Sequence, residues 1–385
     1  MIETTFECHP QPKMRKGDKC WCLSGYRWKD CHMNREKLPK ITLEDTHKAE
    51  ATAQQNTQCL HPDAPHNCSG NAIRSHSVQK NASLKAIAKK SHVLSMGTMS
   101  WGEMEKRDDV KSIIKIKKLG INKASTFPGF CNYHDTELFK PVETKGWKHS
   151  KRNAFLLSLR AISLEYFKKK SVMSFIEWCL KNSDKGYSFE DQAFKQITFR
   201  SGYISFKYGY DDLCKCLNRY HQIYHSNDFS NYNYLCVEFD KKCPVVSCGA
   251  FAPEYDFLGE SLQSITDLNI EEISINIYSL EESSLCIMGY LDGPKKVGKK
   301  FTESLLTLPH QRIPDIILQL ALSSFENTYF NEDWYNNLDK IEQEKLEIFL
   351  DNNAHPDIET HSTYLIDCGW HVFDGKISNI YKNIA

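Results

Sequence analysis

The sequence predicts an α+β fold in which small zinc-stabilised modules precede a larger α+β domain. Residues 1–135 hold seven cysteines and eight histidines but few long amphipathic periods, so metal is the expected source of order there. From Lys151 onward apolar residues recur at helical spacing, and alternating strand-like runs follow between residues 234 and 292. We expect four segments: a zinc motif over 1–38, a linker or helix over 39–58, a second metal module over 59–145, and an α+β regulatory or recognition domain over 146–385.

The composition limits the kinds of protein this chain can be. Its 385 residues suffice for two or three domains, and an apolar fraction of 41% suffices for hydrophobic cores. The 49 basic and 49 acidic residues cancel, so any surface for nucleic acid must be local. No apolar run is long enough for a membrane helix, and the polar start is not a signal peptide. We expect a cytoplasmic protein with reduced cysteines and no membrane partner; the oligomeric state is not indicated.

The first cysteine group has the composition of a closed zinc site. Three thiolates and one imidazole form a tetrahedral ligand set for zinc. A Ser-Gly pair follows the first two cysteines and predicts a tight turn, and we expect Tyr26 and Trp28 to cover the metal. The four expected ligands are Cys20, Cys22, Cys31 and His32.

Residues 16–32 closely resemble the SEC-C motif, which occurs at the end of the bacterial preprotein translocase motor and in many other proteins. The resemblance includes all four ligands, the Ser-Gly turn and the aromatic and basic positions after it. It implies a structural zinc ion and a module that docks onto a protein or a nucleic acid. Because all four positions are filled by protein ligands, it does not imply an enzyme.

A second group of cysteines and histidines lies between residues 59 and 135. The Cys131-x-x-His134 spacing places both side chains on one face at the start of a helix. Two further ligands are expected from the preceding segment, where histidines compete with cysteines for the two places. The expected second zinc site contains Cys59, Cys68, Cys131 and His134, with His61 and His66 as alternatives.

The order of residues in this segment resembles an HNH nuclease, a treble-clef module. A short strand-like run, Ile73–His76, ends in histidine; Asn122 follows, and then a Cys-x-x-His-Asp segment that ends at Asp135. The resemblance, over residues 59–139, implies that His76 is a general base, that Asn122 belongs to the site, and that Mg²⁺ or Mn²⁺ binds near Asp135. The chain departs from the HNH pattern in two spacings, which are both longer than in that module. There are 54 residues between His76 and Cys131, and eight between the first two cysteines.

Two functions follow as alternatives. The first is a metal-dependent nuclease, by analogy a bacterial defence or mobile-element protein, whose second domain regulates it or recognises a partner. The second is a non-catalytic zinc adaptor that docks onto a protein or nucleic acid, with His76 as an ordinary polar residue. An adaptor for the ribosome or the export machinery would act through the first motif alone. His92 is a second candidate base, although a lone histidine in such a run is usually structural.

The last segment alternates predicted helices and strands. A helical pair is expected from residue 151, a further helix face over 213–224, a strand over 234–239 and a hairpin over 272–292. Helices are then predicted near 313–326 and 336–350, with a last strand over 363–367. The segment contains neither a phosphate-binding Gly-x-x-x-x-Gly-Lys loop nor a Gly-x-Ser-x-Gly elbow, so we expect it to sense, bind or oligomerise.

Two lysine-rich stretches and four further cysteines allow other interpretations. The lysines are either a solvated face or phosphate contacts, and the cysteines a third metal site only if their segments meet. The lysines are Lys111, Lys115, Lys117, Lys118, Lys295, Lys296, Lys299 and Lys300, and the cysteines are Cys214, Cys216, Cys243 and Cys248.

Overall fold

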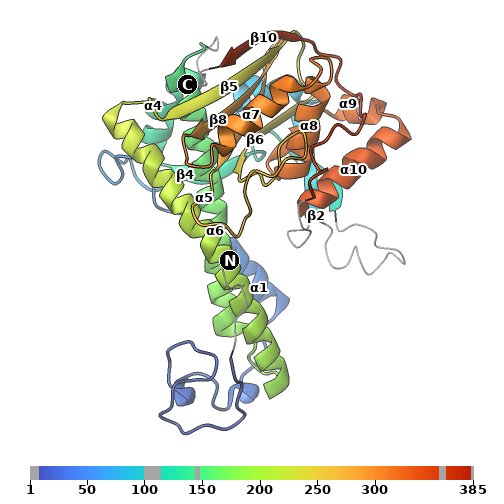
Figure 1. Cartoon of the computed structure of the whole chain (residues 1–385). Helices are drawn as coiled ribbons and strands as arrows, with labels where there is room; N and C mark the ends of the chain where they lie inside the picture. Colours follow the sequence, from blue (N-terminus) through green and yellow to red (C-terminus); the bar gives the residue numbers. More distant parts are fainter. Residues whose placement is uncertain (1–7, 99–113, 144–147, 355–360, 383–385) are drawn as a thin grey trace. The chain divides into compact units, whose positions relative to one another are not determined.

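The computed structural model describes residues 8–98, 114–143, 148–354 and 361–382, and it confirms the α+β prediction (Figure 1). The chain forms two compact units that are not successive segments. Unit 1 comprises residues 1–57 and 166–215, and unit 2 comprises 58–165 and 216–385. Helices α5 (Lys151–Asn182) and α6 (Phe189–Ser226) contribute residues to both units. The segment boundary expected at residue 146 therefore lies inside unit 2.

Unit 1 contains the first cysteine group, helix α1 (Leu43–Ala53) and parts of the two long helices. The cysteine group includes two short 3₁₀ helices, η1 (Trp28–Asp30) and η2 (Arg35–Lys37). Helix α1 begins at a capping box, in which Asp45 N donates to Thr42 Oγ1 at 3.1 Å and Thr42 N donates to Asp45 Oδ2 at 3.0 Å. In the part of the chain that the structure describes, no helix has the length and apolar character needed to cross a bilayer.

Unit 2 is built on an antiparallel sheet of eight strands in the order β10-β5-β8-β7-β6-β9-β2-β3 (Figure 1). The predicted strand near 234–239 and the predicted hairpin over 272–292 are both present, as β5 and as β7 with β8. The strands are β2 (His92–Thr98), β3 (Ile114–Gly120), β5 (Tyr232–Phe239), β6 (Val245–Phe251), β7 (Ile273–Ser279), β8 (Ser284–Leu291), β9 (Thr328–Phe330) and β10 (Ile377–Lys382).

The two faces of this sheet differ in polarity, as the alternation along β7 shows. Ile273, Ile275 and Ile277 face the main apolar core, which also contains residues of α7 (Val297–Thr307), α8 (Ile313–Ser324) and α10 (Lys340–Ala354). The intervening residues, Ser274, Asn276 and Tyr278, point to the other face because side chains alternate along a strand. There Ser274 Oγ donates to Ser158 Oγ of α5 at 2.6 Å. The sheet is therefore apolar toward α7 and α8 and partly polar toward α5.

The predicted strand over residues 363–367 is wrong, because this segment forms turns. Tyr364 N donates to the carbonyl of His361, and Gln319 Nε2 donates to the carbonyls of Tyr364 and Ile366 at 2.9 and 3.0 Å. A side chain of α8 thus takes the carbonyls that a strand would offer to a neighbour. The last strand is β10, and the predicted helices near 313–326 and 336–350 are α8 and, after the short α9 (Glu332–Asn337), α10.

A smaller two-stranded sheet precedes the large one and leads into helix α4 (Asn132–Glu143). Its strands are β1 (Ile73–His76) and β4 (Thr126–Phe130), which pair antiparallel. Between them the chain forms η3 (Lys80–Leu84) and α2 (Lys85–Ile87) and then contributes β2 and β3 to the large sheet. The long separation of His76 and Cys131 is therefore an insertion inside a strand–strand–helix unit.

Candidate metal centres and candidate active site

The first metal centre consists of four side chains of unit 1 whose ligand atoms lie within 4.8 Å of one another: Cys20, Cys22, Cys31 and His32. His32 Nδ1 lies 3.1 Å from Cys20 Sγ and 3.2 Å from Cys31 Sγ, and the Sγ atoms of Cys22 and Cys31 are 3.6 Å apart. Zinc bonds of about 2.3 Å to sulfur and 2.0 Å to nitrogen give tetrahedral edges of roughly 3.5–3.8 Å. The centre is therefore close to the size that holds one ion such as zinc.

Local backbone geometry brings these ligands together. Leu23 and Gly25 both have positive φ, 55° and 82°, so the chain reverses directly after the first two cysteines. Glycine adopts this conformation without steric cost. Cys20 N then donates to the carbonyl of Tyr26 at 2.9 Å, which closes the turn, and η1 delivers Cys31 and His32 to the same point.

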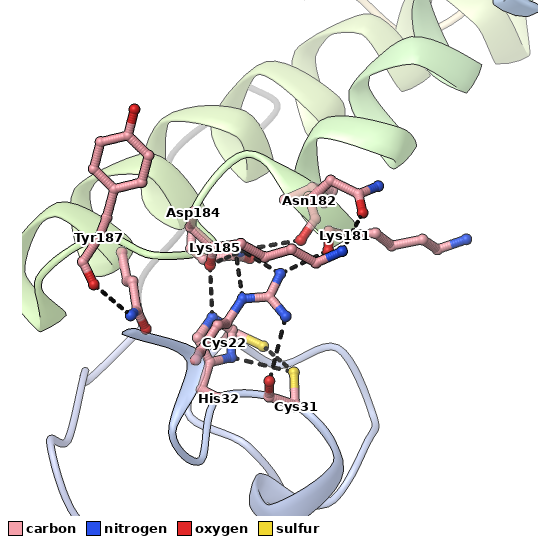
Figure 2. A network of polar contacts seen from close by, with 12 residues as sticks. Cys22, Cys31, His32, Lys181, Asn182, Asp184, Lys185 and Tyr187 are labelled. Atoms are coloured by element: carbon pink, nitrogen blue, oxygen red, sulfur yellow. Dashed lines mark hydrogen bonds and ion pairs between the residues drawn. The ribbon is translucent and has the colours of Figure 1, made fainter. Parts of the chain in front are cut away.

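A buried carboxylate orients the histidine of this centre. His32 Nε2 lies 2.8 Å from Asp184 Oδ2, in the loop between α5 and α6, and Figure 2 shows the two side chains pointing toward each other. Asp184 also accepts from Arg35 Nε at 2.7 Å and Gln196 Nε2 at 2.9 Å. Burial lowers the pKa of His32, but Asp184 and the neighbouring thiols raise it to about 10. A bound zinc ion would replace the proton on Nδ1, while Asp184 keeps the other proton on Nε2. Asp184 was not predicted, because no sequence spacing links it to the motif.

The aromatic cover of this centre differs from the prediction in one residue. Trp21 is 5% exposed, and its ring centroid lies 4.4 Å from that of His32 and 5.9 Å from that of Phe189. Trp28 packs against the same cluster, whereas Tyr26 is 60% exposed. Trp21 therefore excludes water from the thiolates, and Tyr26 is free to meet a partner.

The second metal centre joins the predicted ligands Cys59, Cys68, Cys131 and His134 of unit 2. His134 Nδ1 lies 3.5, 3.5 and 3.4 Å from the Sγ atoms of Cys59, Cys68 and Cys131. Burial raises the pKa of the Cys131 thiol, but backbone N–H groups of His134 and Ser69 oppose it, and the pKa falls to about 7. A thiol that ionises this readily is a good zinc ligand.

The competing histidines are not in this cluster. The His61 ring stacks on the His134 ring with centroids 3.9 Å apart and planes 4° apart, and its Nδ1 accepts from Asp63 N at 3.0 Å. His66 is exposed. Among the described residues only two clusters have metal-binding dimensions, so the alternative third site is absent from them. Its cysteines lie apart, Cys214 and Cys216 on α6 and Cys243 and Cys248 in or beside β6.

The imidazole of His76, the residue predicted as a base, is held by one backbone carbonyl. The residue ends β1, and its Nε2 lies 3.0 Å from the carbonyl oxygen of Ile121. A carbonyl accepts only, so the imidazole carries its proton on Nε2 and its Nδ1 lone pair is available. Burial lowers the pKa of His76, and Lys80 and Arg160 lower it further. His76 is therefore neutral near neutral pH.

The other two predicted site residues lie in the same unit. Asn122 is exposed in the turn after β3 and directly follows the carbonyl that holds His76. Asp135 lies in the first turn of α4, and its Oδ1 atom is buried without a hydrogen-bond partner. Burial raises the pKa of Asp135, while Arg160 and His76 lower it, so the three side chains interact electrostatically. The contact with His76 is thus made by Ile121 and not by the predicted Asn122, whereas Asp135 interacts with His76 electrostatically.

A buried arginine and its partner were missed at the sequence level. Arg160 of α5 is 1% exposed, and its guanidinium lies 3.7 Å from the centroid of the Phe139 ring. Its Nη2 atom forms an ion pair with Glu143 Oε1 at 2.6 Å, but Nε and Nη1 have no hydrogen-bond partner. The signal was present, because Arg160 interrupts the apolar run from Phe155 to Ile162. A charge on an apolar helix face indicates a specific partner.

His92 does not take part in this arrangement. It is exposed at the start of β2, and its Nδ1 lies 2.8 Å from the carbonyl of Lys90. Of the predicted lysine stretches, Lys118 pairs with Glu332 at 2.6 Å and Lys295 pairs with Asp267 at 2.7 Å, while Lys111 lies outside the described residues. Lys118 and Lys295 thus form ion pairs within the fold.

Similarity to known proteins gives this chain no family. No family model, curated protein or solved structure matches it. What the chain contains is therefore established from its own residues: an α+β fold with two Cys₃His clusters able to hold a metal such as zinc.

Proposed function

We propose that this protein is a metal-dependent nuclease of the HNH type that hydrolyses phosphodiester bonds in a nucleic acid. One observation carries the proposal: a neutral, oriented histidine ends the first strand of a strand–strand–helix unit that a Cys₃His cluster closes. The available Nδ1 of His76 and the buried Oδ1 of Asp135 are the groups that such chemistry needs.

In the proposed reaction His76 is the general base. As a water oxygen bonds to phosphorus, His76 Nδ1 takes the water proton and the phosphorus–oxygen bond to the leaving group breaks. The leaving oxygen takes a proton from solvent, and His76 then returns its own proton to solvent, so atoms and charge balance. The hydrogen bond to Ile121 holds the ring in one orientation throughout, and in the neutral ring it keeps the proton on Nε2 so that Nδ1 can accept one.

A divalent ion beside Asp135 would have few protein ligands. Asp135 offers one hard oxygen, and no third cluster of metal-binding dimensions exists among the described residues. Mg²⁺ is commonly held by one or two carboxylates together with water and substrate oxygens, so Asp135 is sufficient as a protein anchor. When bound, Mg²⁺ or Mn²⁺ would stabilise the negative charge that develops on the phosphate and the leaving oxygen.

The two zinc centres have structural roles in this proposal. Each has four protein ligands and therefore no open position for a substrate. The first, in unit 1, would be a SEC-C-like docking module, and the second would hold the first turn of α4 against β1 and β4. The catalytic ion and the zinc ions are thus separate.

The test is cleavage of plasmid DNA and of RNA in Mg²⁺ or Mn²⁺. His76→Ala is expected to abolish cleavage without changing the zinc content, because His76 is not a zinc ligand. His66→Ala is the matched control, since His66 lies in the same segment and is exposed. If the wild-type protein cleaves neither substrate with either ion, or if His76→Ala cleaves as wild type does, the proposal fails.

A second function is favoured by the surface of the first centre. Leu23 and Tyr26, on the turn between the two ligand pairs, are 59% and 60% exposed. Exposed apolar and aromatic side chains on a rigid turn suit docking onto a protein or nucleic acid, with no catalysis. A Leu23→Ala/Tyr26→Ala variant that retains its zinc should then lose co-sedimentation with ribosomal particles. Absence of wild-type co-sedimentation would exclude the ribosome as that partner.

A further inference from the structure

The guanidinium of Arg160 is charged, buried and only partly bonded. Arg160 is 1% exposed, and one of its three nitrogen atoms, Nη2, has a partner, Glu143. Nε and Nη1 make no hydrogen bond of good geometry, although the Tyr278 hydroxyl lies close enough to the guanidinium for Arg160 to lower its pKa. Buried donors without acceptors are costly, and native proteins contain few of them, so each needs an explanation.

Other buried polar atoms without partners belong to side chains near this guanidinium. They include Asp135 Oδ1 on α4 and the Tyr278 hydroxyl on β7. Arg160 interacts electrostatically with both side chains and with His76, so the four share one neighbourhood. Polar groups from α4 and β7, together with the proposed base on β1, thus lie near one incompletely bonded cation.

Glu143 is poorly placed to be a permanent partner of Arg160. It is the last residue of α4, where the partial negative charge of the helix end repels a carboxylate. Its side chain is 37% exposed, whereas that of Arg160 is 1% exposed. The carboxylate is therefore the mobile side of the ion pair and can turn toward solvent when another anion arrives.

We propose that Arg160 binds the phosphate of the nucleic acid at the His76 site, and that Glu143 occupies Arg160 until a phosphate oxygen replaces it. Phosphate oxygens accept from a guanidinium in the same way as carboxylate oxygens do, but a phosphate can engage two of its nitrogens at once. The two donors without partners on Arg160 would then be used. This inference rests on the proposed nuclease function, because His76 defines which phosphate is bound.

The experiment measures binding of a fluorescein-labelled DNA duplex of about 20 base pairs to the full chain by anisotropy. All proteins carry His76→Ala, so binding is read without cleavage. Glu143→Gln is expected to tighten binding roughly three- to tenfold, because it removes the competing anion. An increase in affinity cannot result from misfolding, which makes this variant informative.

Two further variants separate this effect from general charge. Glu137→Gln removes the same charge from an exposed position of the same helix and should change binding less than twofold. Arg160→Lys in the Glu143→Gln background should cancel the gain, because an ammonium lacks the planar fork. Zinc content and thermal midpoint establish that each variant is folded.

The outcomes distinguish this inference from the proposed function. If Glu143→Gln binds the duplex no more tightly than Glu137→Gln, or if Arg160→Lys keeps the gain, the role of Arg160 is refuted even where His76→Ala abolishes cleavage in otherwise wild-type protein. If wild-type protein cleaves nothing but the gain is seen and depends on Arg160, a phosphate site exists and the nuclease function is refuted.

Discussion

At the scale of single residues, two buried charged side chains differ in how many of their hydrogen-bonding atoms have partners. Asp184 is fully buried and accepts from three donors, on His32, Arg35 and Gln196. Arg160 is equally buried and bonds one acceptor. A buried network in which every polar atom has a partner makes a structure rigid. A buried network with polar atoms left unpaired can still bond to a ligand. Asp184 is therefore a structural support of the first Cys₃His cluster, whereas the incomplete bonding of Arg160 is the basis of the phosphate-binding role that we propose for it.

Asp184→Asn should weaken zinc at the first centre by roughly ten- to a hundredfold. The amide has nearly the shape of the carboxylate, but its NH₂ group faces donors on Arg35 or His32, and the charge that supports His32 is lost. The loss of zinc affinity is measured by the rate and extent of zinc release to a competing chelator. The second centre of the same molecule is the internal control. Glu190→Gln, at an exposed residue near the start of α6, should leave release unchanged. Equal release from Asp184→Asn and wild type would contradict the role of Asp184.

The pH dependence of cleavage should report the buried environment of His76. Burial lowers the pKa of this histidine, Lys80 and Arg160 lower it further, and the Ile121 carbonyl and Glu143 raise it. A general base works only when neutral, so activity falls once pH drops through its pKa in the folded protein. Because that pKa lies below its ordinary value of about 6.5, the acidic limb of kcat/KM should have its midpoint below pH 6.5. A midpoint clearly above pH 6.5 would show that another group is titrating.

At the scale of elements, the small unit of β1, β4 and α4 carries a Cys₃His cluster that could hold a metal such as zinc. The two strands pair over a few residues, and α4 has 12 residues. Cys131 and His134 connect the first turn of α4 to Cys59 and Cys68 in the segment before β1. Because a short ribbon and a short helix bury little apolar surface, a metal bound at this cluster would add substantially to their stability.

Cys131→Ser should therefore remove one of two zinc ions per chain and lower stability. If free zinc exceeds its dissociation constant a thousandfold, the loss in unfolding free energy is about 4 kcal/mol. Metal analysis and chemical denaturation measure the two effects. Cys368→Ser, at an exposed cysteine outside both clusters, should change neither. Full zinc content in Cys131→Ser would mean that another residue, such as His61, replaces the thiolate.

At the scale of the whole molecule, the second metal module shares its apolar core with later strands of the large sheet. Val78, Leu84 and Val93 from this module pack with Val246 of β6 and Tyr329 of β9. Strand β2 also pairs with β9, so the module completes the large sheet of unit 2. Any change in the sheet can therefore reach the loops that hold His76.

It follows that residues 59–145 produced alone, with zinc supplied, should lack a stable tertiary structure. The fragment loses the β9 partner of β2 and the half of its core that the later residues contribute. Amide hydrogen exchange should then show little protection in β2 and β3 of the fragment, and strong protection in the intact chain. Equal protection in both would establish the module as an independent domain.

The elements that were predicted correctly are those whose pattern of apolar residues lies within one short segment of the chain. The alternation in 272–292 predicted the β7–β8 hairpin, and the apolar periods near 313 and 336 predicted α8 and α10. Helix α7 was missed because its lysines suggested a charged patch. Its start depends on a distant group, since Glu271 accepts from Lys295 N and Val297 N at 2.7 and 2.8 Å. A helix whose first turn is capped by tertiary contact has no complete sequence signature.

The sequence by itself predicted which residues form the two Cys₃His clusters, and it predicted the position of His76 at a strand end. This was possible because zinc requires particular atoms, and because turns and first helical turns place neighbouring residues together. Only the tertiary structure decided that Asp184 supports His32, that the Ile121 carbonyl orients His76, and that Arg160 lies beside both His76 and Asp135. These partners come from segments far apart in the chain, and their proximity depends on how helices and sheet pack, which residue spacing does not encode.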